Sequence, residues 1–231
     1  MLDVKHYVGL DLGQVSDYTA LVSLRREQEI PDPPRPTAYD PAVADWAEAM
    51  IPPTAKPSAP AKYYCNIAER FERGMSYLTL ADNVCKLFQE PRFAGQVLVI
   101  DGTGVGRPVV DIFRKARPSC RIMPVTITGG ASVGGLVSTR MDELGYWHVP
   151  KKELVGSVQV LLGTGRLEVA PGLRYAGVLI QELKSFSYKI NPQTAHVSLE
   201  SWRERDHDDI VLALALAAWA GERAQQQLWI L

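Results

Sequence analysis

The alternation of apolar and polar positions along the chain predicts an α/β protein. Residues 5–12 alternate as a half-buried strand does, with Leu10 on one side and Asp11 on the other. Gly13 is expected to begin a tight turn, and residues 18–24 are expected to return as the second strand of a hairpin. The chain therefore should open with an antiparallel pair whose first strand ends in a carboxylate.

Helices and strands alternate in the rest of the pattern. Further strands are expected at residues 62–72, 96–100 and 122–128, and helices at 78–88, 108–116, 152–162 and 173–184. Residues 186–190 and 195–199 are expected to form a second hairpin, and a last helix should run from about residue 206 to 222. This order implies a mixed sheet, an antiparallel meander followed by parallel strands, with helices packed on it.

Composition adds an insertion to this picture. Residues 31–61 are rich in proline and alanine, which is typical of a loop or a disordered insertion. Apart from it, residues 1–231 are expected to form a single domain, because 46% hydrophobic and 22% charged residues allow a sizeable core. No run approaches the roughly 18 apolar residues of a membrane span, and no secretory signal pattern is present. Three cysteines without metal-binding spacing indicate reduced thiols and a cytoplasmic location.

Carboxylates lie where the predicted elements begin or end. Asp11 and Asp101 end strands, and three others lie in the first turn or open the last helix: Asp17, Asp208 and Asp209. Open sheets bind ligands beyond the carboxyl ends of their strands, so these side chains are expected to converge there. Phosphodiester hydrolysis by two metals needs short oxygen ligands that hold two ions such as Mg²⁺ or Mn²⁺ ~3.5–4 Å apart. The pattern therefore predicts a nuclease whose acids bind divalent cations.

Each of these acids also has a purely structural interpretation. An aspartate after a strand is most often a turn or capping residue. Asp206 could cap the last helix with Asp209 three residues later, and Asp17 could cap its hairpin turn. Asp206 and Asp209 share a helix face and Asp208 is turned about 100° away, so only one or two of the three can face a metal ion. Residues 210–219 are apolar nearly all round and predict a buried helix, whose acids must lie at an accessible rim or bind cations.

Three stretches resemble the nuclease domain of phage large terminase subunits. They are Gly9-Leu10-Asp11-Leu12-Gly13 on the first strand, the strand that ends in Asp101, and His207-Asp208-Asp209 with the apolar helix that follows. Residues 147–155 and 161–167 are also similar to terminase sequences, so the resemblance covers most of the chain outside residues 31–61. The His-Asp-Asp element with its helix is the most specific part, and Asp-Leu-Gly alone is weak. The resemblance implies the ribonuclease H-like fold, which Holliday-junction resolvases share.

The same resemblance implies a function and a set of residues for it. It implies metal ligands at Asp11, Asp101 and Asp209, assisted by Asp208 or Asp17, with two Mg²⁺ or Mn²⁺ ions at the site. It also implies endonucleolytic cutting of concatemeric double-stranded viral DNA during genome packaging, in the cytoplasm of a host cell. The implied partners are a separate packaging ATPase, the small terminase subunit and the portal.

One feature departs from a full large terminase, which carries an ATPase motor before its nuclease. The chain contains no Gly-x-x-x-x-Gly-Lys-Ser/Thr loop, and its first strand begins within the first dozen residues. The chain is therefore expected to be either an excised domain or a free-standing relative.

Several basic residues are candidates for binding the DNA backbone: Arg140, Lys151, Lys152, Lys184 and Lys189. Lysines at a helix start act together with backbone amides on phosphate, which favours Lys151 and Lys152. An ordinary solvated face explains these residues equally well. The net charge of −1 says little about partners, because bound cations would offset the acidic ligands locally. Backbone contacts of this kind would tolerate any DNA sequence and weaken with salt.

Three other functions remain open from the sequence. A sugar-kinase or actin-like ATPase shares the topology, and its phosphate loops resemble residues 11–13 and 101–104. Such a protein needs two domains closing on nucleotide, however, and has no use for paired aspartates opening the last helix. A Holliday-junction resolvase differs mainly in requiring a symmetric dimer and a branched substrate. A non-catalytic DNA-binding module on the same fold is the third, and the retained acids count against it.

Overall fold

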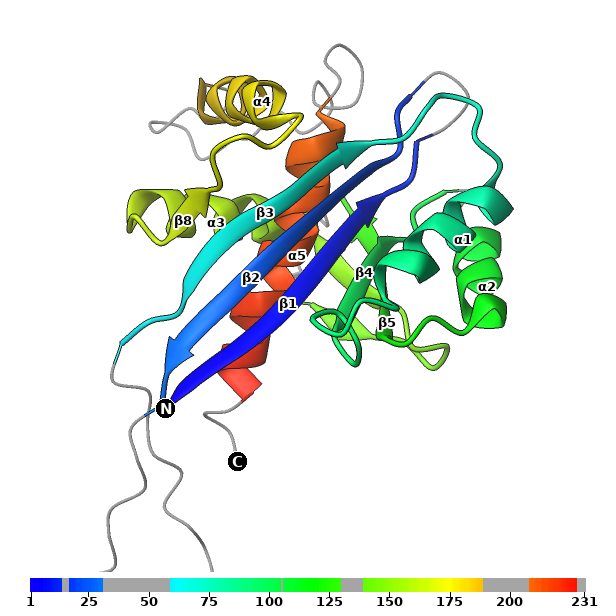
Figure 1. Ribbon diagram of the computed structural model, residues 1–231, viewed down its shortest axis with the longest axis horizontal. Coiled ribbons are helices and arrows are strands. Elements are labelled where there is room, and N and C mark those ends of the chain that lie inside the picture. The colour runs from blue at the N-terminus through cyan, green and yellow to red at the C-terminus, as the bar shows by residue number, and fades with distance from the viewer. Residues whose placement is uncertain (14–16, 31–58, 105, 130–138, 189–207, 228–231) are drawn as a thin grey trace, which may run out of the picture.

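The computed structural model of the protein describes residues 1–13, 17–30, 59–104, 106–129, 139–188 and 208–227. In this part of the chain an eight-stranded sheet has helices on both faces (Figure 1). The strands are β1 (Leu2–Asp11), β2 (Ala20–Glu29), β3 (Lys62–Arg70), β4 (Val97–Asp101), β5 (Arg121–Thr128), β6 (Arg140–Met141), β7 (Trp147–Pro150) and β8 (Leu167–Val169). The helices are α1 (Tyr77–Leu87), α2 (Gly106–Ala116), α3 (Lys151–Gly163), α4 (Ala176–Tyr188) and α5 (Asp209–Gln227).

The strand order is β6-β7-β5-β4-β1-β2-β3-β8. Strands β1, β2 and β3 form the antiparallel meander, and β4, β5 and β7 continue from β1 in parallel. The expected mixed sheet flanked by helices is therefore confirmed. The uninterrupted apolar run at the start of β4 lies in the middle of the sheet, as expected for a strand covered on both faces.

The sequence pattern missed or misplaced a few short elements. Strands β6, β7 and β8 were not expected, since each is too short to show alternation and is defined by its pairing with a neighbouring strand. The expected strand at residues 186–190 is wrong over residues 186–188, which form the last turn of α4. Leu179 and Leu183, four residues apart on α4, are buried, so the helix packs on the core just before this segment and continues through it to Tyr188. Residues 195–199 lie outside the described residues.

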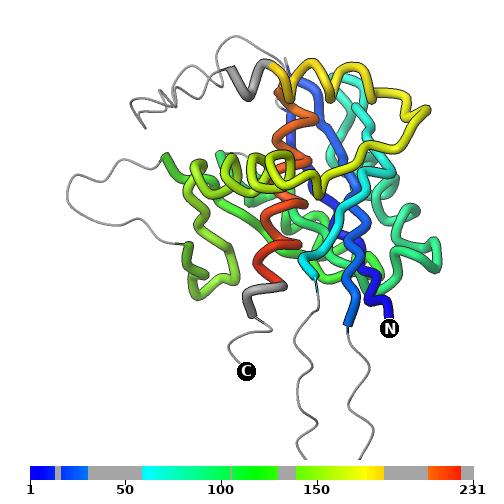
Figure 2. The backbone as a smooth tube through the Cα atoms, turned by 90° about the vertical axis from the view of Figure 1, so that its left-hand side faces the viewer, coloured from blue at the N-terminus to red at the C-terminus, as the bar shows by residue number. Residues whose placement is uncertain are grey.

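Two apolar layers cover the two faces of the sheet. Helix α5 crosses one face behind β1 and β2, with α3 packed against it, and α1 and α2 cover the other face (Figures 1 and 2). The alternation in β1 sorts its side chains between these layers: Tyr7 joins the α5 layer, whereas Val8 and Leu10 join the α1–α2 layer. Asp11 has the same parity as Tyr7 and therefore projects toward the α5 side, as the alternation predicts.

Helix α5 approaches β1 at a glycine. A Cβ atom added to Gly9 would lie 1.9 Å from the carbonyl oxygen of Ala213 and 3.1 Å from the backbone nitrogen of Ala217. Every residue from Ile210 to Ala220 is buried, which fits a helix that is apolar all round. Only glycine at position 9 allows the backbones of strand and helix to come this close.

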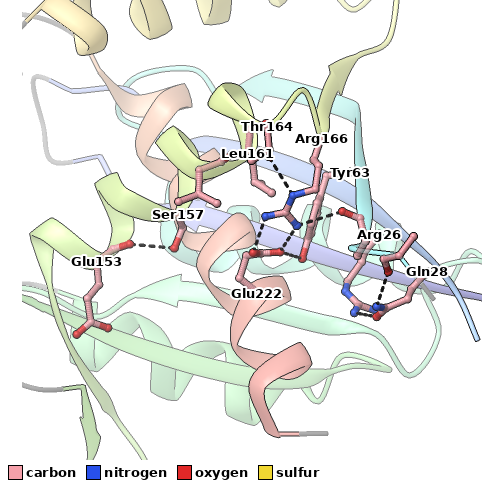
Figure 3. A network of polar contacts seen from close by, with 12 residues as sticks. Arg26, Gln28, Tyr63, Glu153, Ser157, Leu161, Thr164, Arg166 and Glu222 are labelled. Carbon is pink, nitrogen blue, oxygen red and sulfur yellow. Dashed lines mark hydrogen bonds and ion pairs between the residues drawn. The ribbon is translucent and has the colours of Figure 1, made fainter. Parts of the chain in front are cut away.

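The C-terminal half of α5 is held by a polar cluster (Figure 3). Arg166 makes two hydrogen bonds of 2.9 Å to the Glu222 carboxylate, and the Tyr63 hydroxyl donates a third of 2.8 Å. Burial and the Glu222 charge raise the pKa of Tyr63 well above its usual range, so this hydroxyl stays a donor. The cluster ties α5 to β3 and to the start of β8.

Two further expectations are the proline-rich insertion and the lack of a membrane span. Residues 31–58 of the expected insertion lie outside the described residues. None of the helices described here is long and apolar enough to cross a membrane.

Candidate active site

Asp11 and Asp101 end two neighbouring parallel strands at the same level. The β1–β4 ladder pairs Gly9 with Val99 and Leu10 with Ile100, so the next residue on each strand is one of these aspartates. Neighbouring strands lie ~5 Å apart, so the two backbones are adjacent at the carboxyl edge of the sheet. Val99 joins the α5 layer, and Asp101, two residues later, projects from the same face as Asp11.

The first turn of α5 lies over this pair. Ala213 and Ala217 contact Gly9, and Asp209 lies one helical turn before Ala213 on the same helix face. One turn moves ~6 Å along α5, and the two residues from Gly9 to Asp11 move ~6.6 Å along β1 in the same direction. These rises put Asp209 at about the level of Asp11 along the strand, and the convergence of the carboxylates on metal ions stays a prediction.

Local hydrogen bonds fix the orientation of Asp101. Its Oδ1 accepts a 2.8 Å hydrogen bond from the backbone N–H of Thr103, and the Thr103 hydroxyl accepts one of 2.9 Å from the N–H of Ile127. A Cβ on Gly106 would lie 2.5 Å from the Asp101 carbonyl oxygen, so the start of α2 presses against this residue. The side chain is 5% exposed. Asp101 is thus a rigid, nearly buried carboxylate.

Asp11 leads into a tight turn. The Gly13 N–H donates to the Thr19 hydroxyl at 3.1 Å, and the Tyr77 hydroxyl donates to the Gly13 carbonyl at 3.2 Å. A Cβ on Gly13 would lie 2.5 Å from the Asp17 carbonyl oxygen, so the backbone of Asp17 returns close to the end of β1. The side chain of Asp17 is exposed, whereas Asp11 is half-buried.

Asp208 and Asp209 have different roles at the start of α5. The Asp208 carbonyl accepts the first helical hydrogen bond, 3.0 Å from the Leu212 N–H, which makes Asp208 the N-cap residue. Asp209 is the first helical residue and is buried. Its Oδ2 lies 3.5 Å from Nη2 of Arg70, the last residue of β3. Asp206 lies outside the described residues.

Arg70 and Glu182 complete the charged cluster, and the sequence did not single out either. Nη2 of Arg70 lies 2.6 Å from Glu182 Oε1, and Glu182 Oε2 accepts a 2.8 Å hydrogen bond from the Val211 N–H in the first turn of α5. A signal for Glu182 exists in the sequence, because this charged residue interrupts an apolar helical stripe between Leu179 and Leu183. No comparable signal marks Arg70.

The position of Glu182 perturbs its acidity. Burial raises the pKa of Glu182 to about 7; the Val211 N–H and Arg70 act in the opposite direction, and the charges of Asp209 and Asp208 raise it further. Three acids are thus gathered at the start of α5, and the Arg70 guanidinium lies beside two of them.

Replacing Glu182 with glutamine should flatten the pH dependence of stability. The folded protein holds the Glu182 proton up to about pH 7, whereas the unfolded chain releases it near 4.5, so wild-type stability falls as pH rises between these values. We expect the wild type to lose roughly 1–3 kcal/mol more than Glu182→Gln across this window. Urea denaturation of both proteins in EDTA at several pH values measures the difference, and parallel curves would contradict the assignment.

The candidate basic residues are spread around the carboxyl edge. Arg140, Lys152 and Lys184 are exposed, on β6, α3 and α4 respectively. Lys151 is 7% exposed, a location that fits a contact within the protein better than one to DNA. Lys189 lies outside the described residues.

The acids share the carboxyl edge of the sheet, but they do not form a recognisable metal site. Among the side chains that the structure describes, no three histidines, cysteines, aspartates or glutamates are arranged as a metal site. Asp11 and Asp101 end β1 and β4, whereas Asp209 pairs with Arg70 on β3, which is separated from β1 by β2.

Comparison with known proteins adds a family and several structures. A family model described as "Terminase RNaseH-like domain" matches residues 37–220. The chain is similar to crystal structures of the large terminase nuclease from thermophilic phage G20c. The magnesium-bound form has 16% identity and a TM-score of 0.49 over 94% of this chain and 81% of that chain. A second crystal structure of that nuclease has 15% identity and a TM-score of 0.48 over 93% and 81%. The zinc-bound form has 16% identity and a TM-score of 0.46 over 93% and 80%. No curated protein matches the chain.

Proposed function

Because this chain belongs to the terminase RNaseH-like domain family, we propose that it is a metal-dependent endonuclease that cuts double-stranded DNA. One observation carries the proposal: Asp11 and Asp101 end adjacent parallel strands on the face where α5 begins with Asp208 and Asp209. A row of buried or half-buried aspartates at the carboxyl edge of a sheet suits cation-assisted chemistry on a phosphodiester.

The donor set fits a hard divalent cation. Its atoms are carboxylate oxygens, which suit Mg²⁺ and Mn²⁺, and the three described cysteines lie elsewhere in the fold. The cluster already attracts a cationic group, since the Arg70 guanidinium lies against Asp209 and Glu182. Burial is the main cause of the raised pKa of Glu182, and the charges of Asp209 and Asp208 raise it further, so a cation at this place would lie among carboxylates.

Each acid has a role in the proposed reaction. Asp11, Asp101 and Asp209 would hold two ions, and Asp208 or Asp17 would assist them. When bound, such ions activate a water molecule and stabilise the leaving oxygen of the scissile phosphate. The Thr103 N–H keeps Asp101 in a fixed orientation, and the contact of Gly9 with α5 keeps Asp209 at the level of Asp11. The fold would thus hold these carboxylates in position before DNA binds.

DNA binding in this proposal uses the exposed cations near the same edge. Arg140, Lys152 and Lys184 would contact phosphates, and Lys189 is a further candidate. In genome packaging the substrate would be concatemeric viral DNA. The partners would be a packaging ATPase, a small terminase subunit and a portal, acting in the cytoplasm of the host cell.

Plasmid cutting tests the proposed function. The purified protein should nick and then linearise supercoiled plasmid in Mn²⁺ or Mg²⁺, and EDTA should stop the reaction, because the acids alone cannot activate water. Gel electrophoresis over a time course measures both products. A four-way junction and ATP serve as alternative substrates. Preference for the junction would indicate a resolvase, and nucleotide binding without cutting would favour an ATPase-type domain.

A further inference from the structure

We propose that Glu182 is a positioning residue: it holds the Arg70 guanidinium on its own carboxylate and limits Arg70 to a longer ion pair with Asp209. The acid row, which is Asp11, Asp101, Asp208 and Asp209, then stays open to divalent cations. This inference rests on the proposed function, because it assigns a role to a residue that contacts one of the proposed ligands only through Arg70. It adds α4 and the end of β3 to the site.

The distances support this role. The same nitrogen of Arg70, Nη2, lies 2.6 Å from Glu182 Oε1 and 3.5 Å from Asp209 Oδ2. The shorter contact is a charge-assisted hydrogen bond, whereas the longer one is at ion-pair distance. Arg70 is therefore bonded to Glu182 and stands beside Asp209.

Glu182 is itself well placed to hold its partner. Its side chain is 7% exposed, and its second oxygen accepts the Val211 N–H in the first turn of α5. The Glu182 carboxylate thus connects α5, the helix that carries Asp209, to the guanidinium of Arg70. Figures 1 and 2 both show α4, which carries Glu182, beside the start of α5.

Arg70 cannot easily leave the cluster if Glu182 loses its charge. Its guanidinium lies 5.1 Å from the centre of the Tyr18 ring, and its side chain is 13% exposed. With Glu182 neutral, the adjacent carboxylate of Asp209 becomes the strongest attraction for this charge, and the attraction grows as the separation shortens in a poorly solvated site. Arg70 would then occupy the place that a metal ion needs.

Cation affinity in four matched proteins tests the proposal. Mn²⁺ binding is measured by isothermal titration calorimetry and by the electron paramagnetic resonance signal of free Mn²⁺, at about pH 8, where Glu182 is largely ionised. We expect Glu182→Gln to bind Mn²⁺ about tenfold more weakly than the wild type, because Arg70 turns to Asp209. The double variant Arg70→Gln/Glu182→Gln should recover to within about threefold of the wild type, because the competing cation is gone.

Glu222→Gln is the matched control. Like Glu182, Glu222 pairs with an arginine and accepts a further hydrogen bond, here from the Tyr63 hydroxyl. It lies thirteen residues further along α5, ~20 Å from Asp209. It should leave Mn²⁺ affinity unchanged. The glutamine in Glu182→Gln keeps an acceptor for the Val211 N–H, so a capping role alone predicts no change in affinity.

The outcomes separate this inference from the proposed function. If the wild type binds no Mn²⁺, the proposed cation site fails, and the role of Glu182 fails with it. If the wild type binds Mn²⁺ but Glu182→Gln binds equally well, only the role of Glu182 is overturned. The same holds if the double variant binds as weakly as Glu182→Gln while both melt at the wild-type temperature.

Discussion

Asp101→Asn is expected to lower the rate of plasmid cutting by a factor of about 10²–10³. The substitution removes a charge from the most buried and most rigid carboxylate of the acid row, and losing one preorganised charge-stabilising group costs about 10²–10³-fold even where the metal is retained. The fold should survive, because the asparagine oxygen still accepts the Thr103 N–H. Asp11→Asn should behave in the same way, since it ends the neighbouring strand.

Asp142→Asn is the control for this experiment. Asp142 Oδ1 accepts the N–H of Leu144 two residues later at 3.0 Å, which is the same local arrangement that Asp101 makes with Thr103. Asp142 lies in the turn before β7, two strands away from β4 in the sheet. It should cut at the wild-type rate. Wild-type cutting by folded Asp101→Asn, checked by circular dichroism and thermal melting, would refute the assignment of the acid row.

Gly9→Ala should be among the most destabilising single substitutions in the protein. The new Cβ would lie 1.9 Å from the carbonyl oxygen of Ala213. This oxygen belongs to the helix backbone, so the clash can be relieved only by moving α5 away from the sheet. Overpacking of this kind costs about 3 kcal/mol or more when backbone must shift. The shift would also displace Asp209 from Asp11, so cutting should fall together with stability.

Gly156→Ala is the same substitution at another glycine, and it is expected to raise stability rather than lower it. Gly156 lies inside α3, and an added Cβ meets nothing within 4 Å. Alanine there should stabilise the protein by about 0.5–1 kcal/mol, because it reduces the freedom of the unfolded chain. Urea denaturation of the two variants beside the wild type tests both statements. Equal stability of Gly9→Ala and the wild type would show that α5 does not contact β1 as described.

Much of the site could be predicted from local pattern. The alternation in residues 5–12 placed Asp11 on the side opposite Leu10, and the structure puts Leu10 in the α1–α2 layer and Gly9, which has the parity of Asp11, against α5. The apolar run before Asp101 predicted a central strand, and the uniformly apolar residues after Asp209 predicted a buried helix. These predictions succeed because periodicity and burial are coded by neighbours a few positions apart.

The charged surroundings of the acids could not be predicted in this way. Arg70 and Glu182 are 112 residues apart, and their contact depends on how β3 and α4 meet the start of α5. Lys151 was a candidate for phosphate binding, yet the structure buries this residue. It follows β7 directly, and β7 is paired with β5 within the sheet, so α3 begins next to the core. Burial of a polar residue depends on long-range packing, which no local pattern records.

By itself, then, the sequence determined the order of the longer strands and helices, the alternation of faces along β1 and the placing of aspartates at strand and helix ends. Periodicity, turn chemistry and apolar runs carry that information locally. Only the tertiary structure decided that β1 and β4 are neighbours in register, that α5 sits against Gly9, and that Arg70 and Glu182 share the site. Those features depend on close packing between segments distant in the chain, where backbone contact and electrostatics act through space.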